Sequence, residues 1–188
     1  LVPASALEVL AKLDLPPGNV TTSPDGRVFF DLHPFAQPRR FTDATVFELV
    51  DGEPRPYPDK AFQDRYAGVL GLNVDSQGRL WMIEPQGLEK HPTRLLGFDL
   101  ERDELIYEFE FTTKQSRFSQ DLRVSPDGKT MYLADTGIFT FIAPRLIVLD
   151  LDKRQPRTAI TKHQSVRPQR IATRTWDGRR HALAFGAI

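Results

Sequence analysis

Four polar residues recur at nearly the same place in a repeated pattern and are the first candidates for chemistry. Counted back from the glycine of the turn that follows them, they fall within or beside one short alternating stretch: Asn19, Asn73, Gln120 and Asp121. Amide and carboxylate oxygens are ligands that hard cations such as Ca²⁺ and Mg²⁺ prefer. All four are candidates to line a ligand channel, and Asn19, Asn73 and Asp121 are the metal candidates. The alternative is that they cap strand ends and satisfy backbone groups.

A second set has the chemistry for acid–base work. Glu84 and Asp135 end equivalent apolar stretches, and His33 follows the matching residue, Leu32. Two carboxylates and an imidazole near one rim suit general acid–base catalysis. Together with Asp121, the two carboxylates are therefore the catalytic candidates, and His33 is a candidate to line the channel. The alternatives are exposed loop carboxylates and a packing role for His33.

The elements that position these residues come from a phrase that the chain repeats three times. The copies are TTSPDGRVFFD, VDSQGRLWMIE and RVSPDGKTMYLAD. Each has an alternating stretch, a turn with glycine and then an apolar stretch rich in strand-forming residues. The turn glycines Gly26, Gly78 and Gly128 are 52 and 50 residues apart. Repeats of this length are typical of β-propeller blades.

Two further strands complete each unit. They are predicted at ATVFELVDG and EPRPYPD, at TRLLGFDL and DELIYEFEF, and at PRLIVLDLD and PRTAITK. Four strands per unit predict an all-β fold, a β-propeller with blades of four antiparallel strands. The alternative is a sandwich of three unrelated hairpin pairs. The expected division is one partial propeller domain over 1–188, with 1–17 as a closing strand for the last blade, blades over 18–60, 61–115 and 116–161, and a connection or loop excursion over 162–188.

Three segments carry a resemblance to a known family. LPPGNVTTSPDGRVFFDLHPF, LGLNVDSQGRLWMIE and LIVLDLDKRQPRTAITKHQSVRP resemble bacterial members of the major royal jelly protein/Yellow family. The resemblance runs from about Leu13 to about Pro168. It implies the N-terminal half of a six-bladed propeller, distantly similar to SMP-30/gluconolactonase-like propellers. The expectation is a fragment, or a half-propeller completed by another copy or by the missing half.

The lactonase side of this resemblance carries over poorly. Lactonases of that group bind a divalent metal through a Glu, two Asn and an Asp. In this chain Gly18 stands at the position of the Glu, and Gln120 at the position of one Asn. Asp121 matches the Asp of an Asn-Asp pair in many Yellow-type sequences, so it is the best single channel candidate.

Composition excludes several classes of protein. Lysine and arginine number 25, as do aspartate and glutamate, so no bulk field recruits nucleic acid. The absence of cysteine excludes disulfides, thiolate metal sites and a cysteine nucleophile. No apolar run approaches a membrane span. Family members commonly carry an export signal, so we expect a periplasmic or secreted protein, although the composition also suits the cytosol.

Three functions follow as hypotheses. The first is a Yellow-type propeller that binds a small molecule in its central channel, with catalysis not established. The second is a gluconolactonase-like, metal-dependent lactone hydrolase, in which Asp121 is a ligand or base and the cofactor is Ca²⁺ or Mg²⁺. The third is a scaffold whose rim binds other proteins.

Overall fold

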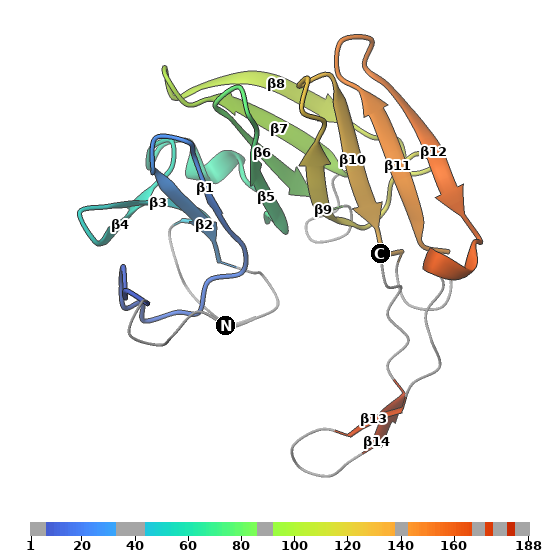
Figure 1. Cartoon of the computed structure of the whole chain (residues 1–188), viewed down its shortest axis with the longest axis horizontal. Helices are drawn as coiled ribbons and strands as arrows, with labels where there is room; N and C mark the ends of the chain where they lie inside the picture. The colour runs from blue at the N-terminus through green and yellow to red at the C-terminus, as the bar shows by residue number, and fades with distance from the viewer. Residues whose placement is uncertain are drawn as a thin grey trace.

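The computed structural model describes residues 7–32, 44–85, 92–137 and 143–166, and the backbone of 172–174 and 180–182. Figure 1 shows three sheets, here called blades 1, 2 and 3, which follow one another along the chain. Each is antiparallel, has four strands and orders them as in the sequence. The predicted fold class is therefore confirmed.

The strands have the following bounds. Blade 1 contains β1 (Val20–Thr22), β2 (Val28–Asp31), β3 (Val46–Val50) and β4 (Glu53–Pro56). Blade 2 contains β5 (Gly71–Val74), β6 (Arg79–Glu84), β7 (Arg94–Asp99) and β8 (Glu104–Glu110). Blade 3 contains β9 (Ser119–Val124), β10 (Thr130–Asp135), β11 (Arg145–Asp150) and β12 (Gln155–Thr161). The remaining described elements are the 3-10 turns η2 (Gln63–Arg65) and η3 (Gln164–Val166) and the paired strands β13 (Ala172–Arg174) and β14 (Arg180–Ala182).

The strand register repeats from blade to blade. Thr21 pairs with Phe29, Asn73 with Trp81 and Arg123 with Tyr132, each from the first strand of a blade to the second. Thr21, Asn73 and Arg123 are the residues that alignment on the turn glycines makes equivalent, whereas Tyr132 follows its glycine by four residues and Phe29 and Trp81 follow theirs by three. The three turn glycines all have positive φ, between 71° and 92°, a conformation that glycine adopts without steric cost.

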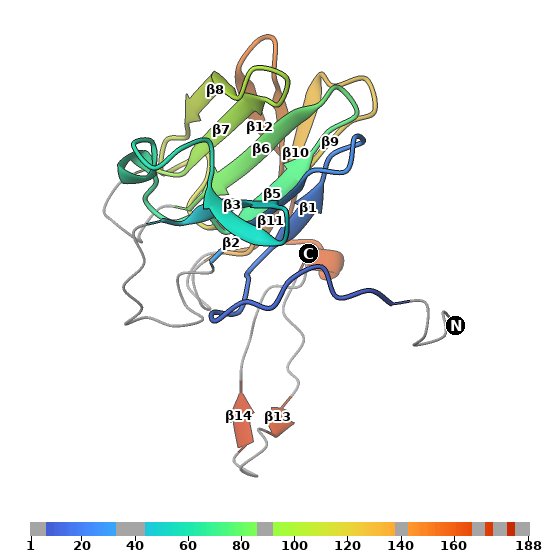
Figure 2. The same cartoon turned by 90° about the vertical axis from the view of Figure 1, so that its left-hand side faces the viewer.

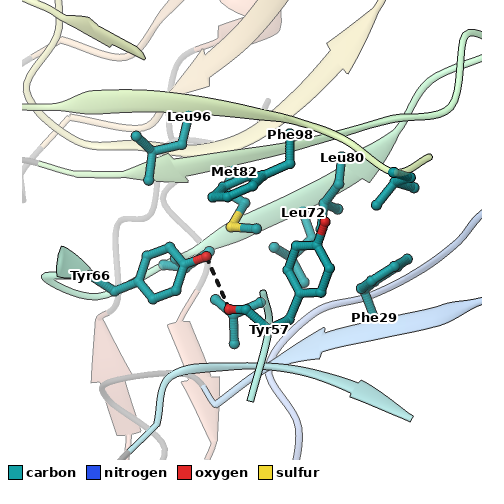
Figure 3. Close-up of a cluster of buried hydrophobic side chains, with 11 residues drawn as sticks. Phe29, Tyr57, Tyr66, Leu72, Leu80, Met82, Leu96 and Phe98 are labelled. Atoms are coloured by element: carbon teal, nitrogen blue, oxygen red, sulfur yellow. Dashed lines mark hydrogen bonds between the residues drawn. The ribbon is translucent and has the colours of Figure 1, made fainter. Parts of the chain in front are cut away.

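Two hydrophobic cores join neighbouring blades. The first lies between blades 1 and 2 and is drawn in Figure 3, where Phe29, Tyr57 and Tyr66 meet Leu80, Met82 and Phe98. Tyr66 donates a hydrogen bond to the backbone oxygen of Tyr57 at 3.2 Å, and burial raises the pKa of both phenols. The second core lies between blades 2 and 3 and contains Trp81, Ile83, Leu95, Leu122, Met131, Leu133, Ile147 and Leu149.

The cores show that blade 2 packs one face on blade 1 and the other on blade 3. The main contacts between sheets join blade 1 to blade 2 and blade 2 to blade 3. In Figure 1 the sheets form an arc, with β4, β8 and β12 along its outside and β1, β5 and β9 on its inside. We call β1, β5 and β9 the inner strands. Figure 2 views the arc from the blade 1 end.

The N-terminal segment lies against that end. Residues 7–17 contain no strand. Lys12 to Leu15 line a groove together with Phe30 and Phe47, whose rings stack on the outward face of blade 1. The predicted partner of this segment, the last blade of a ring, is not among the three described blades, so its closing role stays a prediction.

Candidate functional site

The inner strands bring most of the predicted channel residues into one row. β1 lies beside β5, and β5 lies beside β9. Asn19 immediately precedes β1, Asn73 lies on β5, and Gln120 and Asp121 lie on β9. His33 lies outside the described residues. The candidate site is therefore this inner row.

The Asn19 side chain forms hydrogen bonds within the protein. Its Nδ2 donates to the backbone oxygen of Leu70 at 2.6 Å and to Asp31 Oδ2 at 3.2 Å. Its backbone nitrogen donates to Asp31 Oδ1 at 2.7 Å. One row further on, Thr21 Oγ1 accepts a hydrogen bond from the backbone nitrogen of Val74 at 3.1 Å. Blade 1 thus satisfies backbone groups at the start and end of β5, as in the capping alternative.

Between blades 2 and 3, the backbones of β5 and β9 approach each other closely at the same position. Gly71 occupies the position of Asn19, and a Cβ added there would lie 2.7 Å from the backbone oxygen of Gln120 and 3.2 Å from the Cα of Asp121. Only glycine permits this separation. The close approach places Gln120 and Asp121 directly beside β5, on the face of that strand that also carries the half-buried Asn73.

On blade 3 the row ends in an exposed ion pair. Asp121 Oδ1 accepts hydrogen bonds from the Arg123 guanidinium at 2.9 Å and from the Leu122 nitrogen at 2.7 Å. The two side chains are 55% and 63% exposed. They are the only charged residues within the three inner strands.

Asp121 differs chemically from its counterpart Asn19. An asparagine amide can donate to a carbonyl oxygen, whereas an ionised carboxylate can only accept. Arg123 differs from its counterpart Thr21 in the opposite sense, since a guanidinium donates but does not accept. The pair therefore cannot repeat the backbone contacts that Asn19 and Thr21 make.

Glu84 is a buried residue of the blade 2 framework. Its side chain is inaccessible to solvent and lies 2.6 Å from the Arg94 guanidinium, while Oε1 accepts a hydrogen bond from the Ala67 nitrogen at 2.7 Å. Arg94 also donates to the backbone oxygen of Arg65. The carboxylate thus ties the end of β6 to the start of β7 and to the segment that leads into β5.

Asp135 does the same in blade 3. It is equally buried and accepts hydrogen bonds from Arg145 Nε at 3.2 Å and from the Arg117 nitrogen at 2.9 Å. Arg145 also donates to the backbone oxygen of Lys114 at 2.9 Å. The alternative of exposed loop carboxylates is therefore wrong for Glu84 and Asp135. Their acid–base role stays a prediction, and these contacts do not favour it.

The donors in the inner row fit a divalent cation poorly. Ca²⁺ and Mg²⁺ sites normally gather several oxygens, with carboxylates among them. Here Asp121 is the single carboxylate of the three strands and already pairs with a guanidinium, and Asn19 directs its amide nitrogen to two acceptors. Within the described ranges, no three His, Asp or Glu residues are grouped to hold a metal ion.

Two arginines that the sequence reasoning did not single out link the turns of adjacent blades. Arg27 donates to Glu48 at 2.7 Å and, across the blade boundary, to the Leu100 oxygen at 2.6 Å. Hydrogen bonding to Glu48 raises the pKa of Arg27, against the effect of desolvation. Arg79 reaches the Gly128 oxygen at 2.8 Å. The signal was present in the sequence, because each arginine directly follows a turn glycine.

No family model matches the chain, and no curated protein matches its sequence. Among solved structures, the chain is similar to one described as "YCF48 bound to D1 peptide", with a TM-score of 0.52 and 14% identity, over 81% of this chain and 43% of that one. Weaker similarity extends to a puromycin hydrolase (TM-score 0.46, 17% identity, 87% of this chain, 24% of that one). It also extends to the β-propeller domain of Myceliophteria thermophila Cps50 (TM-score 0.39, 12% identity, 77% and 59%).

The chain spans less than half the length of the YCF48 chain, so it corresponds to part of a propeller of that size. At these identities the likeness concerns the fold. In the part of the chain that the structure describes, no helix is long and apolar enough to cross a membrane. Taken with the three repeated sheets, the comparison identifies the architecture as that of β-propeller blades.

Proposed function

We propose that this chain is part of a Yellow-type β-propeller that binds a small polar molecule at its inner strands, beside Asp121 and Arg123. The observation that carries the proposal is the exposed ion pair on the inner strand of blade 3. The side chains of Asn19 and Thr21 form hydrogen bonds with backbone groups of blade 2, and the backbone of blade 3 packs directly against Gly71. Asp121 and Arg123 are the charged groups of the row, and both side chains are more than half exposed, so solvent and a ligand can reach them.

The chemistry of the pair indicates the class of ligand. The Asp121 carboxylate and the Arg123 guanidinium lie 2.9 Å apart. When a ligand binds, the carboxylate can accept a hydrogen bond from a donor of the ligand, and the guanidinium can donate to an acceptor of the ligand. Ligand sites typically use a few such polar groups to fix orientation within a mostly apolar surface. The preferred ligand therefore carries a hydrogen-bond donor or cation next to a carboxylate or carbonyl.

Two other functions remain as proposals of lower support. A lactone hydrolase of gluconolactonase type would need a cation at the inner row, and the donor set there suits one poorly. A protein-binding scaffold has one point in its favour, since the similar structure YCF48 is described with a bound peptide. A peptide terminus also presents the paired charges that Asp121 and Arg123 would recognise.

The test is isothermal titration of the chain with three probes. These are an α-amino acid, a short peptide and gluconolactone, each with and without Ca²⁺. We expect the zwitterionic probes to bind without the cation, and Asp121→Asn and Arg123→Gln each to weaken that binding about tenfold, which corresponds to about 1.4 kcal/mol. Glu110→Gln, on the outer strand β8, is the matched control. Binding that is equally strong in all variants, or binding of gluconolactone that depends on Ca²⁺, would contradict the proposal.

A further inference from the structure

The backbone of β9 directs alternate residues toward opposite edges of the strand. In an antiparallel pair, every second residue bonds to the partner strand, and the residues between them direct their N–H and C=O groups to the other side. Ser125, directly after β9, donates its backbone N–H to the Thr130 oxygen at 2.8 Å. Counting back in steps of two, Arg123 and Asp121 bond toward β10, so Leu122 directs its backbone groups away from that strand.

The edge to which the Leu122 backbone points is on the inside of the arc. β9 is the last strand of its sheet and pairs there with β10. Figure 1 shows β9 on the inside of blade 3, and it lies beside β5 of blade 2. The N–H and C=O groups of Leu122 therefore lie on the inner edge of the sheet and not on its outward face.

The Asp121–Arg123 ion pair closes over both of these backbone groups. Asp121 Oδ1 accepts a hydrogen bond from the Leu122 nitrogen at 2.7 Å, and the Arg123 guanidinium donates to the Leu122 oxygen at 2.6 Å. The guanidinium also donates to the same carboxylate oxygen at 2.9 Å. The three hydrogen bonds form a closed ring, and Leu122 is only 1% exposed. The inner edge of β9 is thus covered by side chains of its own strand.

A ring of this kind is one that a ligand can open. Exposed ion pairs contribute little to stability, and both side chains are more than half exposed. Their release from Leu122 leaves one backbone donor and one backbone acceptor on the same side of the strand. In an antiparallel sheet such a residue exchanges two hydrogen bonds with the residue that faces it. The complementary ligand therefore carries an N–H and a carbonyl that flank one carbon atom, as in the residue of a peptide.

We propose that the inner edge of β9 binds a short peptide through its backbone, with the central residue of the peptide paired to Leu122. Asp121 and Arg123, released from the ring, then face the charged ends of the peptide. This role, which rests on the proposed function because it uses the same ion pair, names the ligand class and adds Leu122 as a binding residue. The Leu122 side chain stays in the core between blades 2 and 3, so only its backbone takes part.

The test compares two tripeptides by isothermal titration of the chain. One is trialanine, and the other is its depsipeptide analogue, in which an ester oxygen replaces the N–H of the central residue. The two have the same terminal charges and differ in the one donor that would bond to the Leu122 oxygen. We expect the analogue to bind about fivefold more weakly, the usual loss for one hydrogen bond. Equal binding of the two would overturn the backbone pairing and leave the proposed function intact, whereas no binding of either would overturn both.

A second titration asks whether the ring competes with the ligand. The probe is N-acetyl-alanine N-methylamide, which has the backbone groups of a peptide without the terminal charges. Arg123→Ala opens the ring and should bind this neutral probe more tightly than the wild type does, whereas it should bind trialanine more weakly. Lys153→Ala is the matched control, because it removes the cation of another exposed ion pair of blade 3, with Asp150, and should change neither affinity. If Arg123→Ala brings no gain for the neutral probe, the ring does not cover a binding site and the proposal is wrong.

Discussion

Gly71 sets the distance between the inner strands of blades 2 and 3. It lies at the position that Asn19 holds in blade 1, since each residue precedes its turn glycine by seven residues. The structural role of each position was not predictable. The Asn19 side chain extends from blade 1 to the backbone oxygen of Leu70 in blade 2, whereas Gly71 allows the backbones of blades 2 and 3 to lie close together. The difference depends on how closely two backbones approach. That distance is a property of the packed sheets and has no local signal in the chain.

We predict that Gly71→Ala destabilises the protein by about 1–3 kcal/mol, the usual cost of forcing extra atoms into a packed site. The new methyl group would lie 2.7 Å from the Gln120 oxygen, a backbone atom that cannot swing away. Urea unfolding followed by circular dichroism measures the loss. Gly26→Ala is the control, because its Cβ would meet nothing within 4 Å and only its positive φ opposes the change. Equal losses in the two variants would show that the close approach is not a constraint.

At the scale of elements, blades 2 and 3 are each held together by a carboxylate that sequence reasoning assigned to chemistry. The equivalence of Glu84 and Asp135 was visible in the pattern, and the structure gives both the same partners, an arginine ten residues later and a backbone nitrogen before the inner strand. Their burial was not predictable. It depends on the segments before β5 and β9 folding back over the strand ends, which are distant in sequence.

We predict that Arg94→Met costs about 3–5 kcal/mol of stability, because it leaves the Glu84 carboxylate buried without its cation. The double variant Glu84→Gln/Arg94→Met should recover much of this loss, since no buried charge is then left unpaired. Arg123→Met is the control, because its ion pair with Asp121 is exposed and should contribute less than about 1 kcal/mol. Chemical denaturation measures all three. A double variant as unstable as the single one would mean that Arg94 acts mainly through its contact with the Arg65 oxygen.

At the scale of the whole molecule, the blades form a chain of nearest neighbours. The fold class and the strands of the three blades were predicted from the repeat, because a period near fifty residues with one turn phrase per unit leaves few architectures. The order of packing between blades was implicit in that repeat as well.

This arrangement predicts that stability is local to each pair of blades. Phe98 lies in the core between blades 1 and 2, with ring contacts to Tyr57 at 5.6 Å and to Phe62 at 5.2 Å, whereas Leu149 lies in the core between blades 2 and 3. Truncation of a buried phenylalanine or leucine to alanine removes about 2–5 kcal/mol. Phe98→Ala should therefore accelerate amide hydrogen exchange most in β1–β4, and Leu149→Ala most in β9–β12. Exchange that rises equally in all three blades for both variants would show instead that the sheets unfold as one unit, so that the repeat governs the form of the molecule but not its cooperativity.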